Sequence, residues 1–114
     1  MADDPILTSI KKALEDNTIV LFCKGTKEEP RCGFSARTIQ VFKEMGKPFE
    51  VVDVLPDPRI RQILSSVSNW PTIPQVFVGG KFIGGCDIVT EMHQKGELKP
   101  LVEQAFKTQP APAR

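Results

Sequence analysis

Five consecutive apolar residues, Ile19 to Cys23, constrain the fold of this 114-residue chain more than any other segment. A strand with one face in solvent alternates apolar and polar side chains. A continuous apolar and partly β-branched run is instead typical of a strand buried on both faces of its sheet. The run therefore predicts an α/β fold with helices on both sides of a sheet.

The rest of the chain supplies the helices and strands of such a fold. Apolar residues recur every three to four positions in the helical segments, Pro58 can start a helix behind an Asp57 cap, and Gly79-Gly80 is typical of a hairpin turn. The expected helices are 6–17, 34–45, 58–69, 86–95 and 98–106, and the expected strands are 19–23, 49–54, 75–78 and 82–83. This order predicts a four-stranded mixed sheet flanked by helices, as in the thioredoxin fold.

Length and composition exclude several classes of protein. The chain has the size of one domain, and its net charge of +1 gives no footprint for nucleic acid. No apolar stretch approaches the roughly 20 residues of a membrane-spanning helix. A single domain is expected over 1–106, followed by a flexible, proline-containing tail over 107–114.

The cysteines and the N-terminus indicate a compartment. Three cysteines without regular spacing do not suit a secreted disulfide framework, so a reducing compartment is favoured. The first residues include two aspartates and no apolar or arginine-rich leader. The expected location is cytoplasmic, and the alternative is a mitochondrial matrix or plastid form whose transit peptide has been trimmed.

The tetrapeptide Cys32-Gly33-Phe34-Ser35 carries the clearest chemical signal. Cys32 precedes a helix, whose free N–H groups and positive dipole end favour a thiolate, and Arg31 is adjacent. Enzymes with a Cys-x-x-Cys motif resolve a mixed disulfide with the second cysteine, but Ser35 stands at that position here. The alternative for Cys32 is a small apolar residue that happens to start a helix, and Ser35 taken alone is an ordinary first-turn residue. Together they predict a thiol that reacts with an external thiol or binds a metal centre.

Two further segments suit the binding of an extended, charged ligand. In Trp70-Pro71-Thr72-Ile73-Pro74 the last proline is a position for a cis bond, and the Ile73 backbone is free to pair with a peptide, although composition alone favours a rigid connector. In Gly84-Gly85-Cys86-Asp87 the free N–H groups suit a carboxylate, and Asp87 suits an ammonium. The alternatives are that Asp87 caps or favours the helix N-terminus and that Cys86 is a packed small residue rather than a second thiol.

Charged and metal-binding residues elsewhere give weaker signals. Lys24 follows the first strand and Arg61 lies on the third helix, so both are available for an anionic ligand, although most surface cations are merely solvated. Cys23 lies within the apolar run and is assigned to the core. His93, the only histidine, has no cysteine or carboxylate at metal-ligand spacing, so a zinc site is not expected.

These motifs resemble those of the monothiol glutaredoxins of the single-domain CGFS type. The resemblance covers about 6–106 and implies that the protein binds glutathione and, as a dimer, a [2Fe-2S] cluster. It implies delivery of the cluster to acceptor proteins, often beside a BolA-like partner, with Cys32 as reactive thiol and as the cluster ligand. The segments that carry it are Lys24-Gly25-Thr26, Pro30-Arg31-Cys32-Gly33-Phe34-Ser35, Ile60-Arg61-Gln62, Ser68-Asn69-Trp70-Pro71-Thr72-Ile73-Pro74-Gln75-Val76 and Gly84-Gly85-Cys86-Asp87-Ile88.

The resemblance also implies how glutathione is held. Lys24 and Arg61 are implied to bind its glycine carboxylate. Ile73, followed by a cis proline, is implied to pair its backbone with the cysteine of the tripeptide. Cys86 and Asp87 are implied to receive its γ-glutamyl end.

The predicted function is glutathione-assisted binding and transfer of a [2Fe-2S] cluster by a protein that is a homodimer when loaded and a monomer when apo. The alternative is an oxidoreductase that removes glutathione from protein mixed disulfides through Cys32 alone. Such turnover requires rapid attack by a second glutathione, whereas a cluster needs stable thiolates and a glutathione pocket. The carrier is therefore preferred, with at most weak enzymatic activity. A third interpretation is an interaction module of a redox relay.

Overall fold

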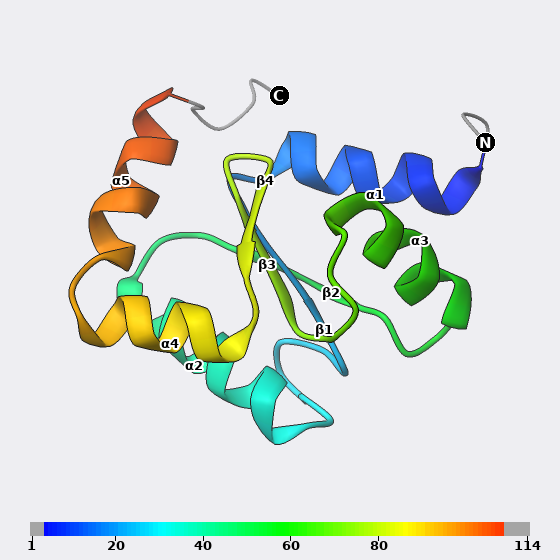
Figure 1. Ribbon diagram of the computed structural model, residues 1–114, viewed down its shortest axis with the longest axis horizontal. Coiled ribbons are helices and arrows are strands. Elements are labelled where there is room, and N and C mark those ends of the chain that lie inside the picture. Colours follow the sequence, from blue (N-terminus) through cyan, green and yellow to red (C-terminus); the bar gives the residue numbers. More distant parts are fainter. Residues whose placement is uncertain (1–3, 109–114) are drawn as a thin grey trace.

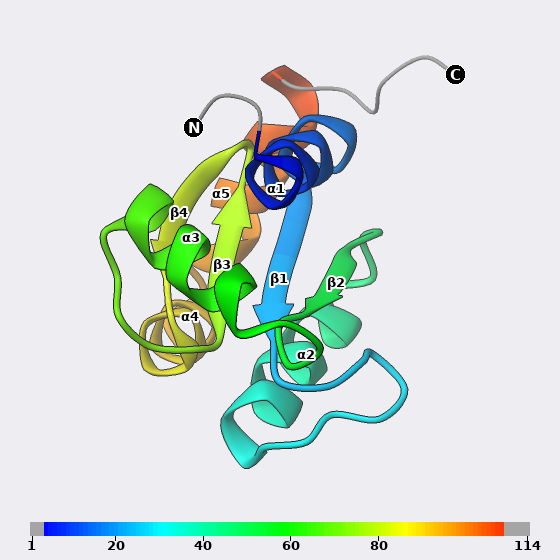
Figure 2. The same ribbon diagram turned by 90° about the vertical axis from the view of Figure 1, so that its right-hand side faces the viewer.

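A computed structural model describes residues 4–108 as one sheet between two layers of helices (Figure 1; Figure 2). The helices are α1 (Pro5–Asp16), α2 (Gly33–Met45), α3 (Pro58–Ser68), α4 (Cys86–Gln94) and α5 (Leu98–Thr108). The strands are β1 (Ile19–Cys23), β2 (Glu50–Asp53), β3 (Gln75–Val78) and β4 (Lys81–Gly84). The predicted order of elements is confirmed. Over residues 4–108, no helix has the length and apolar character needed to cross a bilayer.

The sheet is mixed, with strand order β2-β1-β3-β4. β1 runs parallel to β2 and antiparallel to β3, and β4 completes the hairpin with β3. All five side chains of β1 are fully buried, which confirms the prediction from the apolar run. The parallel β1–α2–β2 unit matters for the site, because it brings the start of α2 to the same end of the sheet as the end of β2.

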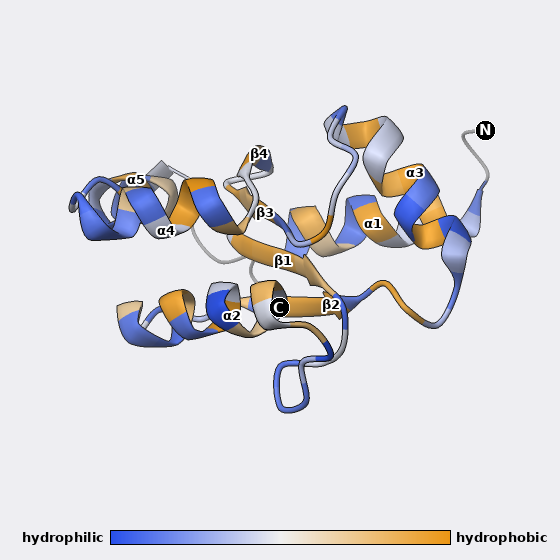
Figure 3. Cartoon of the chain, turned by 60° about the horizontal axis from the view of Figure 1, so that its bottom comes forward, coloured by the Kyte–Doolittle hydropathy of each residue, from blue (hydrophilic) through white to orange (hydrophobic). Residues whose placement is uncertain are grey.

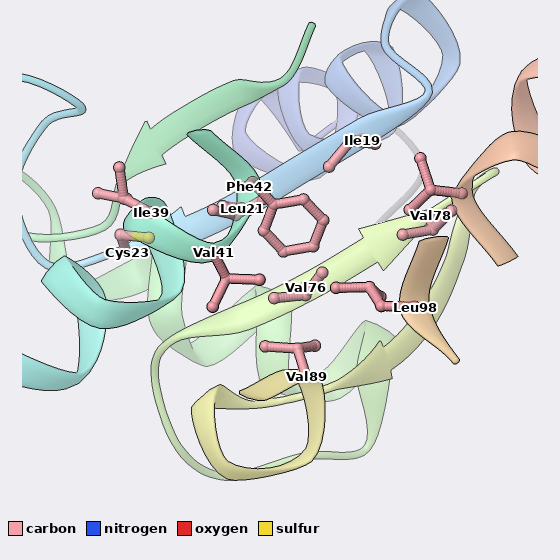
Figure 4. Packing of buried hydrophobic residues seen from close by; sticks show 11 residues of the cluster. Ile19, Leu21, Cys23, Ile39, Val41, Phe42, Val76, Val78, Val89 and Leu98 are labelled. Atoms are coloured by element: carbon pink, nitrogen blue, oxygen red, sulfur yellow. The ribbon is translucent and has the colours of Figure 1, made fainter. Parts of the chain in front are cut away.

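Successive residues of β1 alternate between the two layers. Leu21 and its neighbours on the same face pack against α2, α4 and α5, where Phe42 and Val89 contribute to the cluster (Figure 4). Phe22 packs on the opposite face with residues of α1 and α3. Figure 1 shows α1 and α3 on one side of the sheet and the other three helices on the opposite side. Figure 3 shows a hydrophobic β1 between helices that carry hydrophilic residues on their other faces.

The element ends follow local chemistry. Asp57 caps α3 by accepting a hydrogen bond from the Arg59 N–H at 3.0 Å, and Pro58 occupies the first turn, as predicted. α2 ends at Gly46 in the left-handed conformation, φ 73°. α5 continues to Thr108, two residues into the segment expected to be a tail. The rest of that segment, 109–114, lies outside the described residues.

Candidate functional site

A cavity of about 380 Å³ lies where the start of α4, the residue after β1 and the connection from α3 to β3 meet. The structure brings to it every residue implied as a glutathione contact, and most of the remaining lining comes from the same segments. Cys32 is not part of the lining, but Phe34, two residues further along α2, is. The lining residues are Lys24, Phe34, Arg61, Trp70, Thr72, Ile73, Pro74, Gly85, Cys86, Asp87 and Ile88.

Cys32 is the N-cap residue of α2 and has extended backbone, with φ −153° and ψ 145°. Its side chain is partly exposed, and it makes no side-chain capping hydrogen bond. The first N–H groups of α2 therefore surround a sulfur rather than a hydroxyl or carboxylate oxygen. Helix starts of this kind favour a negatively charged group.

The pKa of the Cys32 thiol is lowered by its surroundings. Burial is the largest single influence and opposes ionisation, but several groups outweigh it. The nearby Ser35 backbone N–H and hydroxyl and the Phe34 N–H favour the thiolate, and so does the positive charge of Lys24. The Cys32 thiol is thus more readily ionised than that of a free cysteine, and the thiolate is the form of cysteine that attacks disulfides and binds metals.

Ser35, at the position of the second cysteine in dithiol proteins, is fully buried. Its Oγ accepts a hydrogen bond from the backbone N–H of Lys24 at 3.0 Å. The serine therefore joins the first turn of α2 to the residue that follows β1. It does more than occupy a helical position, because it fixes the backbone of a lining residue beside Cys32.

The loop between β1 and α2 is held from both ends. The Arg31 N–H donates to the Lys24 carbonyl at 2.8 Å, and Gly25 forms an isolated bridge with Pro30. From the neighbouring strand, the Asp53 carboxylate accepts from the Gly25 N–H at 2.9 Å. These contacts hold the two ends of the loop together. They therefore fix the positions of Lys24, which lines the cavity, and of Arg31, which precedes Cys32.

Lys27 anchors the middle of the same loop. Its Nζ donates to the Phe49 carbonyl at 2.9 Å and lies 4.2 Å from the centre of the Phe49 ring. A cation that combines a carbonyl hydrogen bond with an aromatic face is more firmly placed than a solvated lysine. The loop is therefore a fixed part of the site.

The connection from α3 to β3 presents backbone to the cavity. Its Ile73–Pro74 peptide bond is cis, as the sequence suggested. β3 begins only at Gln75, and the Ile73 backbone makes no hydrogen bond to any residue in 4–108. Arg61 approaches from α3, and its Nη2 donates to the Pro71 carbonyl at 3.4 Å. A free backbone and a nearby guanidinium therefore face the same space.

The start of α4 forms the opposite wall. Gly85 is its N-cap residue, and the first hydrogen bond within the helix runs from the Val89 N–H to the Gly85 carbonyl at 3.1 Å. The N–H groups of Cys86, Asp87 and Ile88 thus have no partner within the helix. Asp87 is exposed in the first turn of α4, but the N-cap residue is Gly85, so Asp87 does not cap the helix. Apart from ligand binding, its remaining role is a favourable interaction with the positive end of the helix dipole.

Gly85 allows this wall to come close to the cis-proline segment. A Cβ on Gly85 would lie 3.2 Å from the Pro74 carbonyl oxygen and 3.6 Å from Trp70 Nε1. Such a contact with backbone is tighter than a side chain normally makes. A side chain at position 85 would therefore push the two walls slightly apart.

The other two thiols are buried. Cys23 is fully buried, and burial raises the pKa of its thiol to about 12. Cys86 is buried as well, with its Sγ 3.8 Å from Thr90 Oγ1, so it is a packed residue that also lines the cavity.

His93 lies 3.1 Å from the Glu44 carboxylate of α2. Residues 4–108 contain no group of three or more histidine, cysteine or acidic side chains arranged to hold a metal ion.

The sequence did not reveal two residues, Asp53 and Gln75, that hold the backbone of the site in place through hydrogen bonds. Asp53 fixes the loop at Gly25, and Gln75 donates to two carbonyls of the cis-proline segment. The available signal was a polar residue at the boundary of an apolar strand in each case. That signal does not name the partner, because the partner of Asp53 is 28 positions away.

Comparison with known proteins finds similarity to glutaredoxins in both the family model and the individual relatives. The family model described as Glutaredoxin matches residues 19–83. A monothiol glutaredoxin ycf64-like protein of Synechocystis is 49% identical over 97 residues, which are 85% of this chain and 91% of the relative. Glutaredoxin 4 of Escherichia coli is 44% identical over 98 residues, which are 86% of this chain and 85% of the relative.

Solved structures agree with this assignment and with the thioredoxin fold. The solution structure of reduced poplar apo GrxS14 is 44% identical, with a TM-score of 0.84 over 94% of this chain and 99% of that one. The holo form of poplar glutaredoxin C1 is 32% identical, with a TM-score of 0.80 over 94% and 95% of the two chains. A buckwheat glutaredoxin–glutathione complex is 29% identical, with a TM-score of 0.78 over 95% and 93%.

Proposed function

The chain belongs to the glutaredoxin family as a monothiol member, and on this basis we propose that it binds glutathione beside Cys32 and, as a dimer, carries a [2Fe-2S] cluster. The observation that carries the proposal is the combination of one partly exposed thiol of lowered pKa with an adjoining cavity lined by complementary groups. We further propose that the cluster is cargo for acceptor proteins, with a BolA-like protein as a partner.

Glutathione fits the chemistry of the cavity along its length. Lys24 and Arg61 supply positive charge for the glycine carboxylate, and the unpaired Ile73 backbone suits the central peptide. At the far wall the free N–H groups of α4 suit the γ-glutamyl carboxylate, and Asp87 suits its ammonium. The volume of about 380 Å³ lies in the range of small-molecule sites. The buckwheat complex with glutathione supports this assignment.

A cluster fits the donor set only when two chains share it. A [2Fe-2S] cluster is normally held by four thiolates, and residues 4–108 offer Cys32 as their one partly exposed cysteine thiol, because Cys23 and Cys86 are buried. A glutathione beside Cys32 would add one thiolate, and a second protomer with its own glutathione would complete the set. The N–H groups of Phe34 and Ser35 help to lower the pKa of the Cys32 thiol and so favour the thiolate that ligation requires. A relative solved in a holo form supports a bound group on this fold.

The lowered pKa of Cys32 also supports a second candidate function, the reduction of protein–glutathione mixed disulfides. The Cys32 thiolate would attack the glutathione sulfur, form a Cys32–glutathione disulfide and release the protein thiolate, which takes up a proton. A second glutathione thiolate would then attack the glutathione sulfur of that disulfide, release Cys32 and form glutathione disulfide. Ser35 cannot resolve the intermediate, so turnover depends wholly on external glutathione.

Anaerobic reconstitution with iron, sulfide and glutathione tests the proposal. We expect a brown protein that elutes as a dimer with two iron atoms and two glutathione molecules, and an apo protein that elutes as a monomer. Cys32→Ser should lose the visible absorbance, whereas the matched control Cys23→Ser should keep it, because that sulfur lies in the core. A coloured Cys32→Ser protein, or a monomer with two iron atoms, would contradict the ligand set.

A further inference from the structure

We propose that Gln75 is a positioning residue of the glutathione site, holding the segment 70–74 in the conformation that presents the Ile73 backbone to the ligand. The inference rests on the proposed binding of glutathione and assigns a role to a residue that the ligand does not touch. Gln75 opens β3, is fully buried and does not line the cavity.

Two hydrogen bonds connect Gln75 to this segment. Its Nε2 donates to the Trp70 carbonyl at 2.9 Å and to the Thr72 carbonyl at 3.1 Å. Both lengths are those of good N–H···O bonds, and together they use both hydrogens of the amide. Two carbonyls separated by one residue can meet a single nitrogen only if the backbone bends around it. The side chain therefore fixes the path of the chain just before Ile73.

The orientation of the amide follows from the same contacts. If the amide were turned over, its oxygen would face two carbonyl oxygens, so the nitrogen must be on this side. The Oε1 atom is buried and has no hydrogen-bond partner within residues 4–108. A buried acceptor without a partner is costly, and the other residues of β3 are apolar. Stability of the strand alone does not explain this residue, whereas its two donors explain it directly.

The segment that Gln75 holds is a wall of the cavity. Trp70, Thr72 and Ile73 all line it, and the Ile73 backbone is unpaired. Two further hydrogen bonds reach the segment. The Trp70 N–H donates to Ser68 Oγ at 3.2 Å where the segment begins. Exposed Arg61 contacts the Pro71 carbonyl at 3.4 Å from the outer side. That bond is longer, and its guanidinium is itself proposed to bind the ligand. Among the hydrogen bonds to the carbonyls of this segment, those from Gln75 are therefore the ones that persist when glutathione enters.

Gln75→Met tests the inference because methionine keeps the length of the side chain and removes both donors. Binding of reduced glutathione is measured by calorimetry and by the emission of Trp70, the only tryptophan in a chain without tyrosine. We expect the dissociation constant to rise about tenfold, as for the loss of one or two neutral hydrogen bonds. The rate of Cys32 alkylation in the free protein should stay within about twofold of the parent. The pKa of the thiol governs that rate, and Gln75 is not among the groups that shift this pKa.

A matched control separates positioning from general destabilisation. Val102→Ala removes buried volume from α5, away from the cavity, and should lower the unfolding midpoint without changing the dissociation constant. A Gln75→Met protein that folds and binds glutathione as tightly as the parent overturns the positioning role alone. A parent protein that does not bind glutathione overturns the proposed function, and the positioning role with it.

Gln75→Glu provides a second variant with nearly the parent shape. As a neutral acid it retains one donor, and as a carboxylate it repels both carbonyls. We expect its dissociation constant, divided by that of the parent at the same pH, to rise as the pH rises through the pKa of the buried carboxyl. A ratio near one at every pH would overturn the inference even if Gln75→Met does not fold.

Discussion

Gly25→Ala is expected to destabilise the protein by acting on the loop before Cys32. Gly25 has φ +97°, and a Cβ there would lie 2.5 Å from the Glu29 carbonyl oxygen and 2.6 Å from the Arg31 nitrogen. Both are backbone atoms of the same loop, so a rotation of a side chain cannot relieve the contacts. The backbone of the loop must move, and its hydrogen bond to Asp53 moves with it.

The size of the effect follows from two contributions. A residue with a Cβ loses about 1–2 kcal/mol in left-handed backbone. Displacing packed atoms costs about 1–3 kcal/mol more. The sum, about 2–5 kcal/mol, is a large fraction of the roughly 5–15 kcal/mol that stabilises a typical domain. Gly46→Ala is the matched control, because Gly46 has φ +73° and a Cβ there meets nothing within 4 Å. It should show only the first contribution.

Urea unfolding of the parent and the two variants measures the difference directly. Gly25→Ala should be less stable than Gly46→Ala by about 1–3 kcal/mol, which is the steric contribution alone. It should also bind glutathione more weakly, because Lys24 precedes Gly25 and lines the cavity. Equal free energies of unfolding for the two variants, within about 0.5 kcal/mol, would refute the reasoning that the loop is held at Gly25.

Three further outcomes are expected. The rate of Cys32 alkylation by iodoacetamide should rise with pH through a midpoint below that of a free thiol, because the pKa of Cys32 is lowered. Cys23, whose pKa is raised to about 12, should not react in the folded protein. Equal rates for the two cysteines would contradict the thiol assignments. Lys24→Ala and Arg61→Ala should each weaken glutathione binding and its salt dependence, measured by titration at several ionic strengths. Asp87→Asn should raise the dissociation constant about tenfold, and an unchanged value would leave Asp87 with a helix-dipole role only.

The sequence was sufficient for most of the fold, because each major element carries a local signature. β1 is an uninterrupted apolar run because both of its faces are buried. The start of α3 is recognisable from Asp57, a typical N-cap residue, followed by Pro58. The end of α5 was placed two residues too early, at the last apolar side chain. Backbone hydrogen bonds continue a helix beyond that point, and Lys107 and Thr108 need no partner in the core.

The site was predictable where chemistry follows chain order and unpredictable where it depends on distant pairs. Cys32 and the start of α4 could be identified from residues beside a helix start. The contact between Asp53 and Gly25 joins two strands' ends, and the bond from Lys24 to Ser35 spans 11 positions. Such pairs arise from the parallel packing of β1 and β2 and from the return of α2 over the sheet. A pattern of residue types does not specify them.

The N–H groups at the start of α2 also govern how readily a disulfide at Cys32 is broken. When an external thiol attacks the outer sulfur of such a disulfide, Cys32 departs as a thiolate, and thiols of low pKa are the faster leaving groups. While the disulfide exists, no negative charge faces the positive end of the helix dipole. The helix would therefore favour release of Cys32 over retention of a mixed disulfide, and an external thiol would free the chain without a second cysteine.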